Sequence, residues 1–286
     1  MDGPVLVTGH LGFLGRALVQ GLEEEGIRWY GASRRSGIDL ANANALAGMP
    51  DCAAVVHLAG RNDVTESWSD PELFHRSNVL STLTVAEYAR QRKARVVFLS
   101  TNLYGAPQYI PVDERHPVAC LNPYGWSKRS AELVLEEYAA CFDVPVTVLR
   151  LFNCYGPRQS NKALIPHLVE QALAGGPIRV NDLTPRRDYV FVDDVVRVIL
   201  RAIARSASAT FDVFNIGFGK SWSVAEVIRL LLDVVGQREV IERGDRRRSE
   251  VDDVVCDNRK ASTALNWAPA VGLPEGLRRM VAVGTL

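Results

Sequence analysis

Residues 8–15, "TGHLGFLG", constrain the fold more than any other stretch, because they place three glycines at G-x-x-G-x-x-G spacing. The apolar run "PVLVTG" precedes them and the amphipathic run "LGRALVQGLEEEG" follows. Gly9, Gly12 and Gly15 would permit a tight turn from a strand into a helix and a close approach of the backbone to a pyrophosphate at the helix N-terminus. The alternative is an ordinary strand-to-helix turn, so the surrounding pattern has to decide.

That pattern is an alternation of short β-branched runs with longer amphipathic ones through the first two thirds of the chain. It is typical of βαβ units. The strands read as almost continuously apolar, as expected where helices cover both faces of a sheet. We predict an α/β fold, a Rossmann-type doubly wound parallel sheet with a smaller mixed, mainly helical C-terminal lobe. The predicted domains are 1–156 plus 188–218, which bind the dinucleotide, and 157–187 plus 219–286, which bind the substrate.

Charge and cysteine content narrow the classes of partner. The 286 residues carry 33 basic and 33 acidic side chains, so net charge gives no reason to expect binding to nucleic acid or to a membrane. No apolar stretch reaches the roughly 18 residues of a membrane helix. Five cysteines without a CxxC pair suit reduced thiols better than disulfides or a metal site. We therefore expect a soluble cytoplasmic protein without a metal.

The second predicted strand, "IRWYGA", ends in Ser33, Arg34 and Arg35. A dinucleotide site that holds an unmodified adenosine ribose usually has an acidic residue at this point, about 20 residues beyond the glycines. Guanidinium groups instead suit a 2′-phosphate, through bidentate charge-assisted hydrogen bonds. A solvated basic turn is the alternative. The sequence thus favours NADP(H) over NAD(H), with Asp39 and Leu40 near the adenine or, for Asp39, capping the next helix.

A second motif, "NPYGWSKRSAELVLEEY", carries Tyr124 and Lys128 four residues apart at the start of a predicted helix. This spacing places both side chains on one helical face. A nearby ammonium group is expected to lower the pKa of Tyr124, so that it can exchange a proton with a substrate hydroxyl. The predicted strand "VVFLS" ends at Ser100 and Thr101, either of which could hydrogen-bond the reacting oxygen.

Taken together, these motifs resemble the extended short-chain dehydrogenases/reductases of the NAD-dependent epimerase/dehydratase family, which act on nucleotide sugars. The resemblance covers nearly the whole chain in order: "TGHLGFLG", "HLAG", "SNVLST", "STNLYG", "PYGWSK", "LRLFNCYGPRQ", "RRDYVFVDDV" and "CDNRKASTALNWAP". It implies that Tyr124 is the acid/base, that Lys128 binds the nicotinamide ribose, and that Ser100, with Thr101 as the alternative, is the catalytic hydroxyl.

The same resemblance implies the binding residues. Those expected to line the cofactor, beyond the three glycines, are His10, Phe13, Leu14, Leu58, Ala59 and Gly60. Asn78 is expected to steady the central sheet or the cofactor. The substrate side is implied to use Asn102, Asn153, Arg187 and Arg247 or Arg248, the last four on the diphosphate. His167 is interpreted as a helix-surface or core histidine.

Departures from the family pattern narrow the reaction. Ser100 is followed by Thr101 and Asn102 rather than by an Asp-Glu pair, which argues against a 4,6-dehydratase. His10 resembles the GDP-fucose synthase branch, but Asn102 stands where that branch has a cysteine. The arginine pair favours a net NADPH-dependent 4-ketoreductase. The alternatives are a 4-epimerase with tightly bound NAD(P) and a non-catalytic NADP-binding sensor. A homodimer through two helices, near 72–92 and 125–142, is expected.

Overall fold

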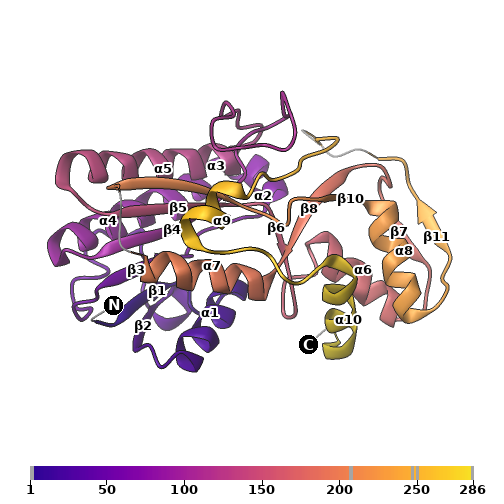
Figure 1. The fold of residues 1–286 in the computed structure, drawn as a ribbon, viewed down its shortest axis with the longest axis horizontal. Helices are drawn as coiled ribbons and strands as arrows, with labels where there is room; N and C mark the ends of the chain where they lie inside the picture. Colours follow the sequence, from indigo (N-terminus) through magenta and orange to yellow (C-terminus); the bar gives the residue numbers. More distant parts are fainter. Residues whose placement is uncertain (1–2, 206–208, 246–247, 249–250, 285–286) are drawn as a thin grey trace.

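The computed structural model describes residues 3–205, 209–245, 248 and 251–284, which form two lobes side by side (Figure 1). The larger lobe is built on a six-stranded sheet in the order β2-β1-β3-β4-β5-β9, and every pairing in it is parallel. Its strands are β1 (Val5–Thr8), β2 (Trp29–Ala32), β3 (Ala54–His57), β4 (Arg95–Thr101), β5 (Val146–Leu151) and β9 (Phe211–Ile216).

Helices cover both faces of this sheet because alternate strand residues point to opposite sides. Val5 and Val7 pack in one core with α1 (Phe13–Glu24) and α7 (Val192–Ala204). Leu6, between them, packs in the other core with α4 (Ser81–Arg92) and α5 (Pro123–Phe142). The strands are buried on both sides, and the predicted doubly wound sheet is confirmed.

The helix that leads into α4 is not uniform. It begins with α2 (Val64–Ser69) and α3 (Pro71–His75) and passes through a π-helical turn, Arg76–Leu80, before α4. Asp63 and Asp70 accept hydrogen bonds from the first-turn amides of α2 and α3, which fixes where each begins. The wide turn at Arg76–Leu80 matters for the site, because single π turns inside α-helices occur frequently at functional sites.

The second lobe has a core of its own around Leu168, Val227 and Leu277. It contains a three-stranded sheet, a two-stranded sheet and three helices: β6 (Asn153–Tyr155), β8 (Arg186–Phe191) and β10 (Ser221–Ser223); β7 (Ile178–Val180) and β11 (Val240–Glu242); α6 (Leu164–Leu173), α8 (Val224–Val235) and α10 (Leu273–Val283). The last short helix, α9 (Arg259–Leu265), packs in the larger lobe instead. The predicted domain limits stay a prediction.

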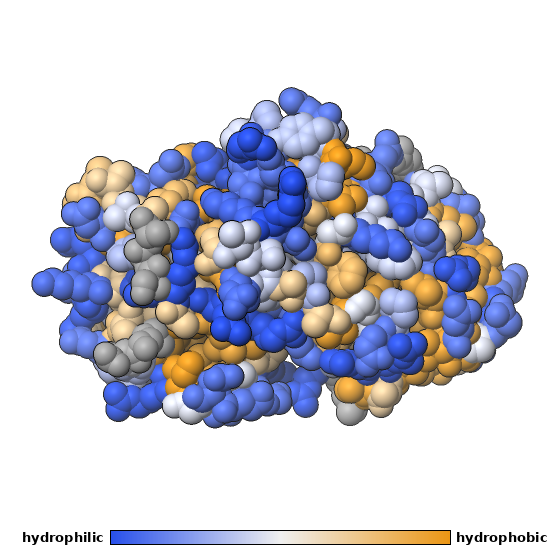
Figure 2. Space-filling view, in the orientation of Figure 1, coloured by the Kyte–Doolittle hydropathy of each residue, from blue (hydrophilic) through white to orange (hydrophobic). Residues whose placement is uncertain are grey.

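The surface and the thiols agree with an ordinary globular chain. Figure 2 shows hydrophilic side chains over much of one face, with apolar ones gathered over the second lobe at the right. None of the helices within the described ranges is both long and apolar enough to cross a membrane. All five cysteines are free thiols, as predicted.

Candidate functional site

The glycine turn between β1 and α1 is required by packing. Gly9 has a φ of 72°, and a Cβ there would lie 2.9 Å from the amide nitrogen of Ala59. A Cβ on Gly15 would lie 2.2 Å from the carbonyl oxygen of Gly9. Gly12 stands just before the first residue of α1 and donates its N–H to Gly9 at 2.9 Å. Only glycines allow the loop to fold this tightly onto the helix N-terminus.

A cavity of about 250 Å³, which we call the glycine-turn cavity, opens beside this loop. Ten of the predicted cofactor residues line it: Gly9, Gly12, Ser33, Arg34, Arg35, Asp39, Leu40, Leu58, Ala59 and Gly60. Sequence reasoning missed five more, Leu11, Ile38, Ala41, Ser77 and Ser81. The first three adjoin residues that were named, whereas Ser77 and Ser81 are brought in by the helix that flanks Asn78.

Seven residues predicted at this cofactor site lie outside the lining of the cavity: His10, Phe13, Leu14, Gly15, Asn78, Tyr124 and Lys128. The first three pack against the protein itself. The ring of His10 covers the backbone of Gly31, where a Cβ would come within 2.6 Å of it. Phe13 packs close to Gly156 and against the second-lobe core, and Leu14 packs against both lobes' cores. Their contact with a cofactor stays a prediction, and in this structure they secure the first helix turn.

The arginine pair sits on a single 3₁₀ turn, Arg34–Ser36, at the rim of the glycine-turn cavity. Ser33 and Ser36 cap the turn reciprocally, and Gly37 ends it with a φ of 83°. Asp39 accepts a hydrogen bond from the amide of Ala41 at 3.1 Å, so it closes the following turn while it lines the cavity. Both guanidinium side chains are exposed, which leaves them available to an anion.

Tyr124 and Lys128 lie in the first two turns of α5, and their pKa values are shifted by burial. Burial raises the pKa of Tyr124 to about 12, partly opposed by a hydrogen bond with the Thr101 side chain. Burial also lowers the pKa of Lys128 to about 7, and its Nζ donates to the carbonyl of Leu99 at 2.7 Å. The predicted lowering of the tyrosine pKa by Lys128 is therefore wrong in this geometry, because desolvation outweighs it.

The two candidate hydroxyls of β4 are placed differently. Thr101 bonds the Tyr124 phenol, whereas Ser100 is 4% exposed and its Oγ is buried without a hydrogen-bond partner among the described residues. A buried hydroxyl without a partner is uncommon and marks a position to explain. Asn102 follows Thr101 and donates its N–H to the carbonyl of Leu151. It lines neither the glycine-turn cavity nor the larger cavity of the second lobe.

A buried ion pair beneath α5 was not foreseen. Arg150 of β5 meets Glu132 with two hydrogen bonds, of 3.0 and 2.7 Å, one helical turn beyond Lys128. Tyr104 completes the cluster by accepting from Arg150 at 3.0 Å. Glu132 is fully buried and also pairs with Arg129 at 3.1 Å, so two guanidinium groups compensate its charge in the core. This pair fixes the depth of α5 against the sheet.

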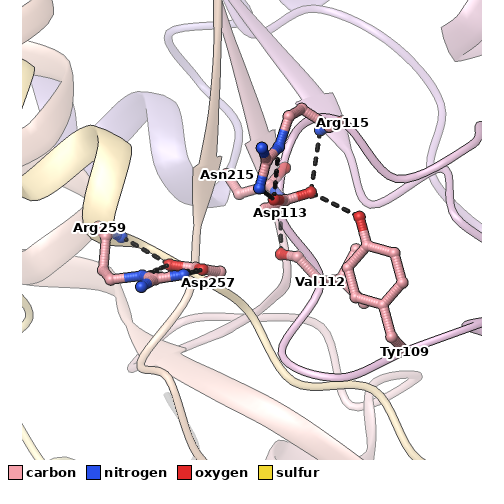
Figure 3. Close-up of polar contacts among 7 residues, drawn as sticks. All are labelled: Tyr109, Val112, Asp113, Arg115, Asn215, Asp257 and Arg259. Carbon is pink, nitrogen blue, oxygen red and sulfur yellow. Dashed lines mark hydrogen bonds and ion pairs between the residues drawn. The ribbon is translucent and has the colours of Figure 1, made fainter.

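The loop between β4 and α5 is fastened at its middle (Figure 3). Asp113 accepts hydrogen bonds from Tyr109 and Arg115, both at 2.7 Å, and Asn215 of β9 donates to the carbonyl of Val112 at 3.0 Å. These contacts hold the segment that leads into α5. Its last residue, Asn122, then caps the helix by accepting from the Gly125 amide at 2.8 Å.

A larger cavity, about 410 Å³, lies in the second lobe, and we call it the second-lobe cavity. Asn153 and Arg187, both predicted to bind substrate, line it. Sequence reasoning missed most of its other polar residues, among them Gln159, Lys162, Arg179, Asn181 and Asp245. His167 is on the surface of α6, as one of its two interpretations held, but it also lines this cavity.

The late basic segment is described only in part. Arg247 lies outside the described residues. The guanidinium of Arg248 stacks 3.7 Å from the ring centre of Trp68 in α2. Lys162, at the edge of the second-lobe cavity, pairs with Asp63 at the start of the same helix, at 3.0 Å. Two cationic side chains of the second lobe thus reach α2 in the first.

Comparisons with known proteins agree with this geometry. The model of the NAD dependent epimerase/dehydratase family matches residues 5–217. The chain is 30% identical to a putative UDP-glucose 4-epimerase of Methanocaldococcus jannaschii over 97% of both chains, and 30% identical to a UDP-glucose 4-epimerase of Mycolicibacterium smegmatis over 96% of both.

Solved structures that resemble it cover 98% of both chains with a TM-score of 0.90. They include MoeE5 with UDP-glucuronic acid and NAD, at 30% identity, and a Thermotoga maritima UDP-glucose 4-epimerase with UDP-glucose, at 28%. RMD from Pseudomonas aeruginosa, complexed with NADPH, is 26% identical.

Proposed function

The chain belongs to the NAD dependent epimerase/dehydratase family, and we propose that it is a nucleotide-sugar 4-epimerase with a tightly held nicotinamide dinucleotide. The observation that carries the proposal is the pairing of Tyr124 with Thr101 at the end of β4, in a chain that also has a glycine-lined cavity and a larger polar one. The likeness to UDP-glucose 4-epimerases over nearly the full chain supports it. It replaces the net 4-ketoreductase that the sequence favoured.

The glycine-turn cavity fits such a cofactor. A Cβ on Gly9 would fill the cradle against the backbone of Ala59, and Gly12 caps the helix whose N-terminus would meet a pyrophosphate. Lys128 lies beyond, where the nicotinamide ribose would reach it. Bound here, the nicotinamide ring supplies hydride acceptance and return.

The proton is handled by the chain itself. Tyr124 would exchange a proton with the sugar hydroxyl at C4, and the Thr101 hydrogen bond favours its phenolate. Lys128, held on Leu99, has its pKa lowered to about 7 by burial, and a phenolate forming nearby would favour its charged form. Epimerisation further requires the keto sugar to turn over within the site before the hydride returns.

The second-lobe cavity would hold the nucleoside diphosphate. Arg187 reaches its wall from β8 while one of its nitrogens donates to the carbonyl of Val251 at 2.6 Å. Asn153, at the end nearest the large sheet, would meet the diphosphate beside it, with Arg247 or Arg248 closing from the late segment. The nucleotide base and the sugar are left open in this proposal.

A second candidate, an NADPH-dependent 4-ketoreductase, is favoured by one observation. Arg34 and Arg35 occupy the rim where a 2′-phosphate would sit. The related RMD is complexed with NADPH. We accordingly propose NADP(H) over NAD(H) for this chain, whether the net reaction is epimerisation or reduction.

One experiment separates these candidates. The purified protein is denatured, the released nucleotide is identified, and a panel of UDP-, dTDP- and GDP-sugars is tested for 4-epimerisation and for consumption of NADPH. If the protein is an epimerase, denaturation should release a bound cofactor, and the native protein should convert a sugar without net consumption of NADPH. A reductase consumes NADPH with a 4-keto sugar. Tyr124→Phe should cut either rate by about 1,000-fold. Turnover unchanged in that variant would reject Tyr124 as the acid/base, and a wild type that converts no sugar would leave only a non-catalytic NADP-binding sensor.

The catalytic hydroxyl can be assigned by a matched pair of variants. Thr101→Val removes the hydroxyl that bonds Tyr124, and Ser100→Ala removes the neighbouring one. We propose Thr101 from its bond to the phenol, so Thr101→Val should lower kcat more, by about 100-fold. A larger loss in Ser100→Ala would reassign the role to the residue that the family resemblance implied.

We also propose a cytoplasmic homodimer formed through α4 and α5. Large apolar side chains are exposed on both helices, including Leu83 at 42%, Trp126 at 56% and Leu133 at 50%. Pairing across a two-fold axis would bury them. Light scattering should give about twice the 31.5 kDa chain mass, and a monomeric mass at micromolar concentration would reject this part of the proposal.

A further inference from the structure

A row of buried hydrogen bonds starts at the wall of the glycine-turn cavity. The amide of Ala59, which lines the cavity, donates to Oγ1 of Thr8 at 3.2 Å. That hydroxyl lies 2.7 Å from Nδ1 of His57, at the end of the neighbouring strand β3. Thr8 and His57 are both fully buried, so neither exchanges these partners for water.

The partners of His57 fix where its proton lies. Its Nε2 is 3.0 Å from Oγ1 of Thr82, and that hydroxyl already donates its hydrogen to the main-chain carbonyl of Asn78, at 2.6 Å. Nε2 must therefore donate, and Nδ1 must accept from Thr8. The neutral ring agrees with burial and the Lys128 charge, which lower the pKa of His57 to about 3. From the amide of Ala59 to the carbonyl of Asn78, each group of the row therefore donates to the next, by way of Thr8, His57 and Thr82.

The row continues into the helix that carries Tyr124. The side-chain amide of Asn78 donates to Oγ of Ser127 at 2.8 Å, and Ser127 donates to the main-chain carbonyl of Tyr124 at 2.7 Å. Asn78 sits at the centre of the π-helical turn, and its main-chain carbonyl accepts from the Thr82 hydroxyl four residues on. The Asn78 side chain also bonds both main-chain groups of Arg61, so it cannot rotate without losing three hydrogen bonds.

We propose that His57, Thr82 and Ser127 are positioning residues that couple occupation of the glycine-turn cavity to the placement of the first turn of α5. The cavity wall includes Ala59 at one end of the row and Ser81 beside Thr82. A dinucleotide bound there would contact Ala59, whose amide is linked through this row of hydrogen bonds to the carbonyl of Tyr124. This inference rests on the proposed function only for the catalytic role of Tyr124.

Thr82 offers a matched pair for the test. Thr82→Val keeps the shape and removes the hydroxyl that joins His57 to Asn78, whereas Thr82→Ser keeps the hydroxyl. The readout is hydrogen exchange of the Tyr124–Lys128 amides in protein freed of bound cofactor, before and after addition of NADPH or NADH. Addition of cofactor should slow the exchange of these amides by at least tenfold in the wild type and in Thr82→Ser. In Thr82→Val, which should still bind the cofactor, the exchange should slow by less than threefold.

Turnover supplies a second readout. Thr82→Val should lose about tenfold in kcat with KM for the nucleotide sugar within about twofold, while Thr82→Ser stays near wild type. Equal protection and equal kcat in the two variants would overturn the proposal, because a merely structural hydroxyl would alter thermal stability alone. Should Thr82→Val fail to fold, Ser127→Ala breaks the row at its other end and is judged by the same two readouts.

The exchange measurement also separates this proposal from the proposed function. It requires cofactor binding but no turnover. If the wild type converts no nucleotide sugar yet shows protection that Thr82→Val loses, the proposed function fails and the coupling stands. If turnover is present and protection is identical in all variants, the coupling fails alone.

Discussion

The glycine-turn cavity takes its walls from four short segments, 9–12, 33–41, 58–60 and 77–81, three of which directly follow strands of one parallel sheet. The second-lobe cavity instead collects side chains from β6, the start of α6, β7, β8 and single residues as late as Asp245. The first is shaped mainly by backbone and the second mainly by side chains. A cavity shaped by backbone can be recognised from the glycines in the sequence, whereas a cavity shaped by side chains depends on which distant segments pack together.

The largest test of this difference is Gly15→Ala. An added Cβ would lie 2.2 Å from the Gly9 carbonyl and 2.6 Å from Cα of His10, and neither backbone atom can move aside cheaply. Alanine normally stabilises a helix by about 1 kcal/mol relative to glycine, but here overpacking should cost about 3 kcal/mol. Cofactor affinity should fall at least 100-fold, measured by titration with NADPH.

The control for that change is Gly48→Ala, at an exposed glycine with no atom near its missing Cβ. It should keep the wild-type affinity and stability within about 0.5 kcal/mol. Similar losses in both variants would mean that the glycine turn is not the backbone-shaped cradle described above.

A smaller effect is expected from the only cationic side chains that line that cavity within the described residues. Replacing Arg34 and Arg35 together with Ala removes charge-assisted hydrogen bonds worth about 2 to 3 kcal/mol. NADPH should bind about 50-fold more weakly, while NADH changes less than threefold. Arg201→Ala, an exposed arginine of α7, serves as the control. Equal weakening of both cofactors would contradict recognition of a 2′-phosphate.

The outcome of the sequence predictions follows the same division. Gly9, Gly12, Gly60 and the Ser33–Arg35 turn could be placed because a strand end and a glycine spacing dictate their geometry. Arg179 and Lys162 could not be, since nothing local distinguishes them from solvated charges.

A further set of residues could not be predicted because it is buried. The Glu132–Arg150 pair and the His57 row lie within the core, where a charge or ring nitrogen is defined by partners 18 to 49 residues away. The spacing of Tyr124 and Lys128 was read correctly as one helical face, but the direction of the tyrosine pKa depended on burial, which spacing does not encode.

The buried row of hydrogen bonds around His57 and the exposed wall of the second-lobe cavity should also differ in how acid affects the stability of the protein. The pKa of His57 is lowered to about 3 in the folded chain, against 6.5 when exposed. Below pH 6.5 the His57 side chain is therefore protonated in the unfolded chain but stays neutral in the folded chain. The free energy of unfolding accordingly decreases as the pH is lowered. Between pH 7 and pH 5 the loss from this residue is about 2 kcal/mol.

Denaturant unfolding at the two pH values measures this loss. His57→Gln should lose about 2 kcal/mol less than wild type on acidification, whatever its stability at pH 7. His167→Gln, the same exchange at the exposed wall of the second-lobe cavity, should lose as much as wild type. Equal losses in all three proteins would mean that His57 is protonated in the fold.

The smallest effect belongs to the side-chain-built cavity. Arg187 lines it while donating to the carbonyls of Arg186 and Val251, at 2.7 and 2.6 Å, so its guanidinium is held in place and only part of it can meet a ligand. Arg187→Ala should weaken UDP binding about tenfold, or roughly 1.4 kcal/mol, and leave NADPH binding within twofold.

Calorimetric titration with UDP measures that change, and Arg229→Ala on the exposed surface of α8 is the control in the same lobe. Because several polar side chains share the wall, the loss of one should be partial, unlike the loss of the single backbone turn at Gly15. A UDP affinity that falls 100-fold would show that this cavity, too, depends on one element. Weakening of NADPH by the same factor would show that the two cavities are not separate in function.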